Sequence, residues 1–207
     1  MNQTRWLNLM QAMGFPPSIG CYQALEKAYS QPHRYYHTVK HIDAMLKHFD
    51  SVKLLAEQSA ELELAIWFHD AIYNIPSSRN ELDSALWAKE FVLTNQYDEA
   101  GAKRIFDLIM ATQQHEKSSL IDANIIVDTD LAILGSSPAT YAEFEQNIRR
   151  EYHMVPEDIY RAKRAEILEH FLAQGSIYKL DSFISQYESA ARENISRAID
   201  SLKTNQH

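Results

Sequence analysis

The sequence predicts an all-α protein, a single-domain bundle of about eight helices. Apolar residues recur at helical spacing through most of the 207-residue chain. No segment shows the sustained apolar–polar alternation that marks a half-buried strand. Five glycines and six prolines are few for this length and leave room for long helices. No shift in composition marks a domain boundary, so we expect one domain over residues 1–207.

The N-terminal part is predicted to contain three helices. The first ends at Gly14, which is followed by two prolines. A second helix is expected over 18–30, and a third over 37–55, where apolar residues repeat at i, i+3, i+4 and i+7. The third segment is thus amphipathic, with one apolar face.

The middle of the chain is predicted to contain helices over 59–73 and 98–114, with another that starts at Asn80. A breaker loop over 74–78 precedes Asn80, whose side chain is suited to capping a helix. The run 123–135 is apolar but interrupted by carboxylates, and it fits either a short strand or a buried helix.

The last third of the chain is predicted to form three helices, over 138–153, 156–174 and 181–203. A proline and Gly175 separate them, and the apolar positions keep the helical period throughout.

The composition of the chain limits which binding partners and which cellular compartment can be expected. A net charge of −8 argues against a nucleic-acid polymer, because such proteins normally carry a basic patch, but it allows a small anionic substrate. The single cysteine, Cys21, excludes an internal disulfide and a thiolate zinc cluster, and we expect a cytoplasmic protein. No apolar run approaches the ~20 residues of a membrane span, and the N-terminus does not read as a signal peptide, so no membrane partner is expected.

A histidine and an aspartate stand side by side, His69 and Asp70, within the apolar run 65–73. Burying an ionised carboxylate costs several kcal/mol unless a counter-charge or hydrogen bonds compensate, so Asp70 needs a partner. One interpretation is a metal cation at the helix edge, held also by ligands from other segments. The other is a core histidine beside an aspartate that caps a helix or pairs with an arginine.

Further candidate ligands favour the metal. His41 lies on the predicted helix 37–55, and Asp130 lies inside the later apolar run. Two imidazoles and two carboxylates suit a divalent ion such as Mn, Mg, Fe, Ni or Zn, one or two per site. Open coordination positions could hold water and a phosphate oxygen, the arrangement that metal-assisted hydrolysis needs.

The order His41, His69-Asp70, Asp130 resembles that of the HD-domain metal-dependent phosphohydrolase superfamily, whose fold is a helical bundle around the metal. The segment Tyr-His-Thr-Val-Lys-His-Ile, residues 36–42, is similar to a segment of HD proteins related to cyclic-nucleotide phosphodiesterases. The wider layout resembles a bacterial subgroup described as predicted HD phosphohydrolases. The resemblance implies an HD-type bundle over the whole chain.

The resemblance also implies roles for individual residues. It makes His41, His69, Asp70 and Asp130 the metal ligands, with Asp130 favoured over Asp128. It makes His37 a candidate general acid for the leaving oxygen. If two ions bind, Asp70 is the natural bridge between them.

Three other residues are candidates for the site, and two of them, Glu81 and His115, have open alternatives. Glu81 could bind or activate water, or be a carboxylate that stabilises the start of a helix. His115 could contact phosphate or a second ion, or be a cation favoured at a helix C-terminus. Arg34 could meet an anionic substrate, whereas His153, His170 and His207 are expected to be peripheral.

The function expected from these residues is hydrolysis of a small phosphate ester or a nucleotide, by water that the metal activates. One alternative is a regulatory HD module that binds metal and nucleotide without turnover. Another is a di-iron HD-type oxygenase, which His115 keeps open as an additional ligand.

Overall fold

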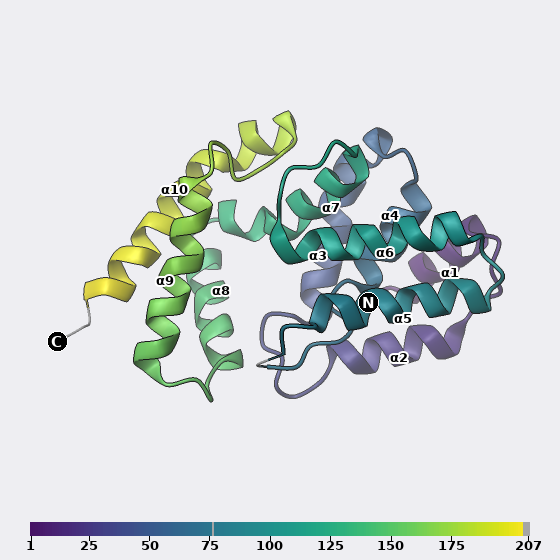
Figure 1. Cartoon of the computed structure of the whole chain (residues 1–207), viewed down its shortest axis with the longest axis horizontal. Coiled ribbons are helices and arrows are strands. Elements are labelled where there is room, and N and C mark those ends of the chain that lie inside the picture. Colours follow the sequence, from purple (N-terminus) through teal and green to yellow (C-terminus); the bar gives the residue numbers. More distant parts are fainter. Residues whose placement is uncertain (76, 205–207) are drawn as a thin grey trace. The chain divides into compact units, whose positions relative to one another are not determined.

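The computed structural model describes residues 1–75 and 77–204 (Figure 1). Pro76, in the predicted breaker loop, and His207, predicted to be peripheral, lie outside the described residues. Over the described ranges the chain forms ten α-helices and two short 3-10 helices, with no β-strand. The all-α prediction is confirmed, with ten helices where about eight were expected.

The helices follow one another closely along the chain. In order they are α1 (Gln3–Ala12), α2 (Ile19–Tyr29), α3 (Val39–Val52), η1 (Lys53–Leu55), α4 (Ser59–Phe68), α5 (Asn80–Thr94), α6 (Glu99–Gln114), α7 (Ile121–Leu131), η2 (Ala132–Gly135), α8 (Pro138–Glu151), α9 (Glu157–Ala173) and α10 (Asp181–Thr204).

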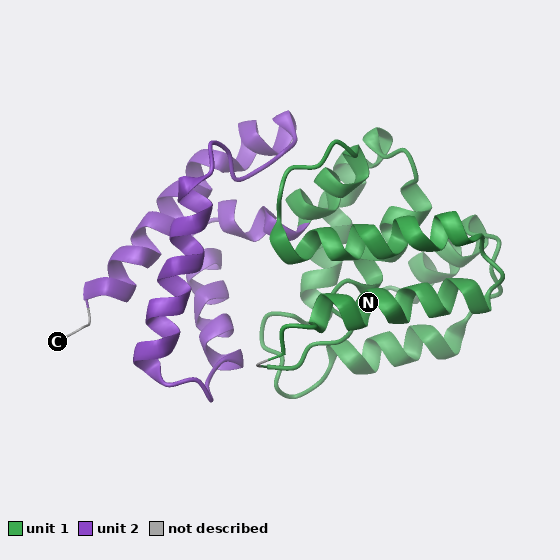
Figure 2. Ribbon diagram, in the orientation of Figure 1, with its two compact units in different colours: residues 1–129 green, residues 130–207 purple. Residues whose placement is uncertain are grey.

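The chain divides into two compact units, residues 1–129 and 130–207 (Figure 2). The division falls inside α7, so Asp130 continues a helix whose earlier residues belong to the first unit. The expectation of one domain over the whole chain stays a prediction. None of the helices in the described part of the chain is both long and apolar enough to cross a bilayer.

Helix α4 is the centre of the first unit. Its residues 61–68 are all buried, and it packs against α1, α3, α5 and α6. Two of those buried residues are acidic and are paired: Glu61 accepts hydrogen bonds from Arg104 and Tyr97, while Glu63 accepts from Arg5. Because both charges are compensated, α4 can be buried on every side.

Helix α4 ends earlier than the sequence predicts. Residues 59–73 were expected to be helical, but the helix stops at Phe68, with His69 as its C-cap and Asp70 in the turn that follows. Contacts from distant residues stabilise the turn, because Arg34 donates to the carbonyl oxygens of Asp70 and Ala71. His69 itself keeps helical backbone angles, with φ −55° and ψ −37°, and Asp70 follows it in the turn.

The run 123–135, for which both strand and helix were open, is helical, forming most of α7 and then η2. The start of α7 is attached to the start of α4. The two carboxylate oxygens of Asp122 accept hydrogen bonds from the main-chain N–H groups of Glu57 and Gln58, each at 2.8 Å. These are amide groups at a helix N-terminus that no local side chain caps.

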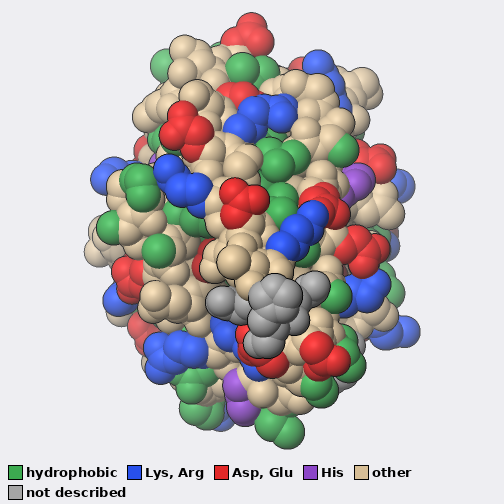
Figure 3. All heavy atoms as spheres, turned by 90° about the vertical axis from the view of Figure 1, so that its left-hand side faces the viewer, with side chains coloured by type: hydrophobic (Ala, Val, Ile, Leu, Met, Phe, Trp, Pro, Cys, Tyr) green, Lys and Arg blue, Asp and Glu red, His purple; other side chains and the backbone are tan. Residues whose placement is uncertain are grey.

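The second unit contains η2 and the helices α8, α9 and α10. Asn194 of α10 is buried and donates to the carbonyl oxygens of Leu134 and Ser136, which attaches α10 to η2. The face drawn in Figure 3 shows acidic and basic side chains interspersed, without a basic stripe among the described residues drawn there.

Candidate metal centre

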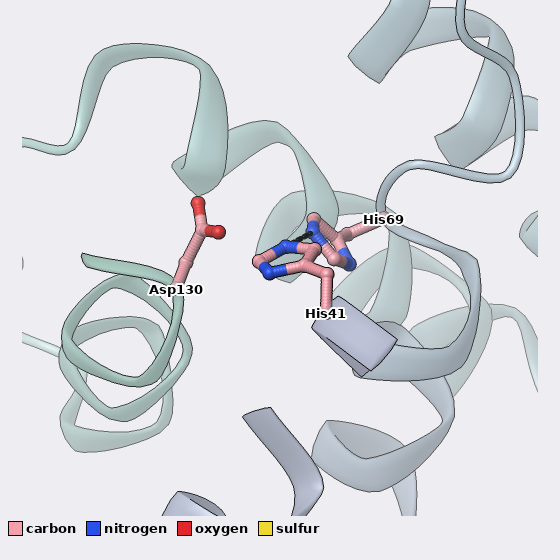
Figure 4. Close-up of side chains that lie close together, drawn as sticks. All are labelled: His41, His69 and Asp130. Carbon is pink, nitrogen blue, oxygen red and sulfur yellow. Dashed lines mark hydrogen bonds between the residues drawn. The ribbon is translucent and has the colours of Figure 1, made fainter. Parts of the chain in front are cut away.

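Two histidines from different helices meet at one point. His41 lies in the first turn of α3, after the N-cap Thr38, and His69 is the C-cap of α4. Both side chains are buried, and their Nε2 atoms lie 3.2 Å apart (Figure 4). Two imidazole nitrogens of this kind are suited to sharing a metal cation.

The Asp70 carboxylate reaches the same point from the turn after α4. Its Oδ2 atom lies 3.0 Å from Nε2 of His69 and 3.6 Å from Nε2 of His41, and 14% of the side chain is exposed. Ligand atoms at roughly 2.0–2.2 Å from one cation lie about 3 Å apart at right angles and about 3.5 Å apart at tetrahedral angles. The three atoms therefore have the mutual spacing of ligands to one ion.

Asp130 completes the group from α7. One ligand atom each from His41, His69 and Asp130 lie within 4.8 Å of one another, and this group could hold a metal ion (Figure 4). Asp128 lies two residues earlier, is fully buried and does not belong to this group of described residues. Two helical residues at this spacing point about 200° apart, so only one of the two carboxylates can face the histidines.

The second nitrogen of His69 determines which nitrogen is available as a ligand. Its Nδ1 atom lies 3.0 Å from the carbonyl oxygen of Ile66, and a carbonyl can only accept, so Nδ1 carries the proton. In the neutral imidazole this leaves a lone pair on Nε2, which faces His41 and Asp70. The residues present thus fit a divalent cation in donor type, spacing and tautomer.

Asp70 is ionised even without a cation. In the metal-free protein, burial raises the pKa of its carboxyl, but electrostatic attraction to His69, then to His37, a hydrogen bond with His69 and attraction to His41 outweigh it; a cation bound at Nε2 of His69 would take the place of the proton that this hydrogen bond needs. The pKa of Asp70 therefore lies below its ordinary value of 3.8. A carboxylate that is already charged needs no proton loss to bind a metal ion.

His37 stands beside the candidate ligands. Its ring centroid lies 5.9 Å from that of His41 and 4.3 Å from that of Tyr73, and its side chain is partly exposed. Tyr36 contacts both His37 and His41. The sequence analysis did not single out Tyr73, whose ring contacts that of His37. Tyr73 ends the apolar run that contains His69 and Asp70, and its position in the sequence gives no sign of the contact.

The side chain of Arg34 makes hydrogen bonds with main-chain atoms. It is buried and donates to the carbonyl oxygens of His37, Asp70 and Ala71. The expectation that it meets a substrate is untested by these contacts, which instead connect two segments of the chain. Aromatic residues around Arg34 in the sequence are the one signal that could have suggested an enclosed guanidinium.

Glu81 and His115 lie at helix ends. This is where each would lie if Glu81 only stabilises the start of a helix and His115 is only a cation at a helix C-terminus. Glu81 is the second residue of α5, partly exposed, and has no ion-pair partner among the described residues. His115 is the C-cap of α6, with a left-handed φ of 54°. Neither belongs to the ligand group found in the described residues.

Comparison of the chain with protein-family models, with curated protein sequences and with solved structures found no significant match.

Proposed function

We propose that this chain is a metal-dependent phosphohydrolase of the HD type, acting on a small phosphate ester or a nucleotide. One observation carries the proposal: Nε2 of His41, Nε2 of His69 and Oδ2 of Asp70 converge at separations of 3.0–3.6 Å. Asp130 adds a second carboxylate to the two histidines. Nitrogen and carboxylate ligands without thiolates are typical of ions that activate water and bind phosphate oxygens.

Each candidate ligand would have its own role toward the cation. His41, His69 and Asp130 would hold the cation, and Asp70 would contribute one oxygen to it while its second oxygen stays available for a second ion or a water molecule. A divalent cation in this site would acidify bound water and polarise a phosphoryl oxygen. Two imidazoles and two carboxylates suit Mn, Mg, Fe, Ni or Zn.

His37 would supply the proton for the leaving group. The protonated imidazole gives its proton to the ester oxygen as the phosphorus–oxygen bond breaks, and the alcohol leaves neutral. Support comes from its place next to His41 and from the rings of Tyr36 and Tyr73, which restrict its orientation. Glu81 stays a candidate for orienting water, and His115 for contacting phosphate.

Product formation tests the proposal. The purified protein would be reconstituted with Mn²⁺ and incubated with a nitrophenyl phosphodiester, a nitrophenyl phosphate monoester and a panel of nucleotides. We expect turnover of at least one substrate, lost in Asp70→Ala. The matched control is Asp107→Ala, which removes an exposed carboxylate paired with Lys103. Turnover retained in Asp70→Ala would contradict the assignment, and nucleotide binding without product would favour a regulatory module.

A further inference from the structure

We propose that Arg34 is a positioning residue, which fixes the main chain that carries His37 relative to the main chain that carries Asp70. The inference rests on the proposed function, because it concerns the same site, and it assigns Arg34 a role other than substrate binding. On this proposal, the buried guanidinium of Arg34 holds the candidate site in shape and does not contact the substrate.

The hydrogen bonds of Arg34 join two separate segments. Its Nη1 atom donates to the carbonyl oxygen of Asp70 at 2.7 Å and to that of His37 at 3.1 Å, so one nitrogen contacts both segments. Its Nη2 atom donates to the carbonyl oxygen of Ala71 at 3.0 Å. The first segment leads into α3 and thus to His41, and the second follows His69.

Two aromatic rings flank the guanidinium. Its Cζ atom lies 5.1 Å from the ring centroid of Tyr29 and 5.2 Å from that of Tyr73, and only 5% of the residue is exposed. Tyr73 also contacts His37, so the ring that restrains Arg34 also restrains the candidate acid. A planar, weakly hydrated guanidinium suits such a place, and its fork of donors directs several hydrogen bonds at once.

The carbonyl groups that Arg34 binds belong to a turn at the end of α4. Carbonyl groups in a turn lack the regular partners that a helix supplies, and a buried carbonyl without a partner is costly. Arg34 donates to the carbonyl oxygens of Asp70 and Ala71 in the turn after α4, and so stabilises the chain direction that aims Asp70 at His69. A lysine has the charge but lacks the planar fork, and it cannot reproduce these directions.

Nitrogen NMR of the metal-free protein tests the inference without any substrate. We expect Arg34→Lys to shift the ring ¹⁵N signals of His37, His41 and His69 while thermal unfolding stays cooperative. The matched control is Arg104→Lys, which disturbs a guanidinium that binds the Glu61 carboxylate of α4, eight residues and about 12 Å along the helix from His69. The control should leave the histidine signals unchanged. Unchanged histidine signals in Arg34→Lys would overturn the inference.

The wild-type protein gives a second measurement in case Arg34→Lys does not fold. A guanidinium held by three carbonyl groups rotates slowly, so its Nη protons should give separate signals, whereas exposed arginines give averaged ones. Averaged Arg34 Nη signals would overturn the inference.

Co²⁺ titration then separates this inference from the proposed function. We expect Arg34→Lys to alter the visible spectrum of bound Co²⁺ and to lower its affinity at least tenfold. A substrate-binding arginine would leave both unchanged and raise KM alone. If the wild type binds no Co²⁺, the proposed function fails, while the two NMR results still decide the role of Arg34.

Discussion

The Nδ1 atom of His69 lies 3.0 Å from the carbonyl oxygen of Ile66, three residues earlier in α4. This hydrogen bond at the end of the helix fixes both the tautomer and the ring orientation of the histidine. The Nε2 atom is thereby directed at His41 and Asp70. A short contact between Ile66 of α4 and the C-cap residue of the same helix thus orients a candidate metal ligand.

Replacing His37 should separate catalysis from metal binding. We expect His37→Gln to lower kcat by about 10²–10⁴-fold, the usual contribution of a general acid, while the bound metal content stays at the wild-type level. The measurement is turnover of a nucleotide or alkyl phosphate ester that the wild type hydrolyses, together with elemental analysis of the same preparation. A variant that loses metal and activity together would show that His37 is a ligand or a structural residue.

A substrate with an activated leaving group gives an internal control for that prediction. A nitrophenolate leaves without protonation, so the effect of His37→Gln should be much smaller on nitrophenyl esters than on alkyl esters. An equal loss on both would contradict the role of proton donor.

Removing Asp122 should weaken both stability and metal binding. Its carboxylate accepts hydrogen bonds from the main-chain N–H groups of Glu57 and Gln58 at the start of α4. We expect Asp122→Ala to lower the free energy of unfolding by about 1–2 kcal/mol, as for the loss of a helix cap. Metal affinity should fall as well, because α7 carries Asp130. Urea unfolding and metal titration are the measurements.

The control for Asp122 is Glu99→Ala, which removes an exposed carboxylate from the first turn of α6. It should change the free energy of unfolding by less than about 0.5 kcal/mol. If Asp122→Ala behaves like this control, the attachment of α7 to α4 contributes little.

Glu188 should make stability depend on pH. Burial raises the pKa of its carboxyl, but hydrogen bonds from the main-chain N–H groups of Ile177 and Tyr178 and from Arg192 outweigh burial and lower it below 4.5. A carboxyl whose pKa is lower in the folded state stabilises the protein above its ordinary pKa and loses this effect as the pH falls. We expect Glu188→Gln to be about 1–2 kcal/mol less stable than wild type at pH 7.

The difference between wild type and Glu188→Gln should shrink below about pH 4.5, as the wild-type carboxyl takes up its proton. Urea unfolding at pH 7, 5 and 3.5 measures it. Glu143→Gln, at an exposed position of α8, should show no such trend. A difference that is constant with pH would contradict the assignment to Glu188.

The sequence was sufficient to predict the helical class because apolar spacing is a local property. It was insufficient for the end of α4, where the apolar run continues to Tyr73 and no glycine or proline marks a stop. The helix ends there because Arg34 and Ser84, both distant in sequence, bind main-chain groups of the following turn. Such contacts leave no periodic signal.

In the candidate site, too, some features could be predicted from the sequence and others could not. The types of the candidate ligands, and their order along the chain, could be read from His41, His69-Asp70 and Asp130, of which His41, His69 and Asp130 form a group that could hold a metal ion. The contacts of Arg34 could not, because an arginine beside a motif suggests substrate binding equally well. Nor could the sequence decide whether 123–135 is a strand or a helix, since a buried run is apolar in both.

The presence of metal is the most direct test of the central claim. Elemental analysis would compare the wild type, His69→Ala, Asp70→Ala and the control Asp107→Ala after reconstitution with Mn²⁺ and removal of excess ion. We expect about one or two ions per chain in the wild type and the control, and loss of metal in both site variants. A wild type that binds no metal, or site variants that keep it, would contradict the assignment of this site to a metal ion.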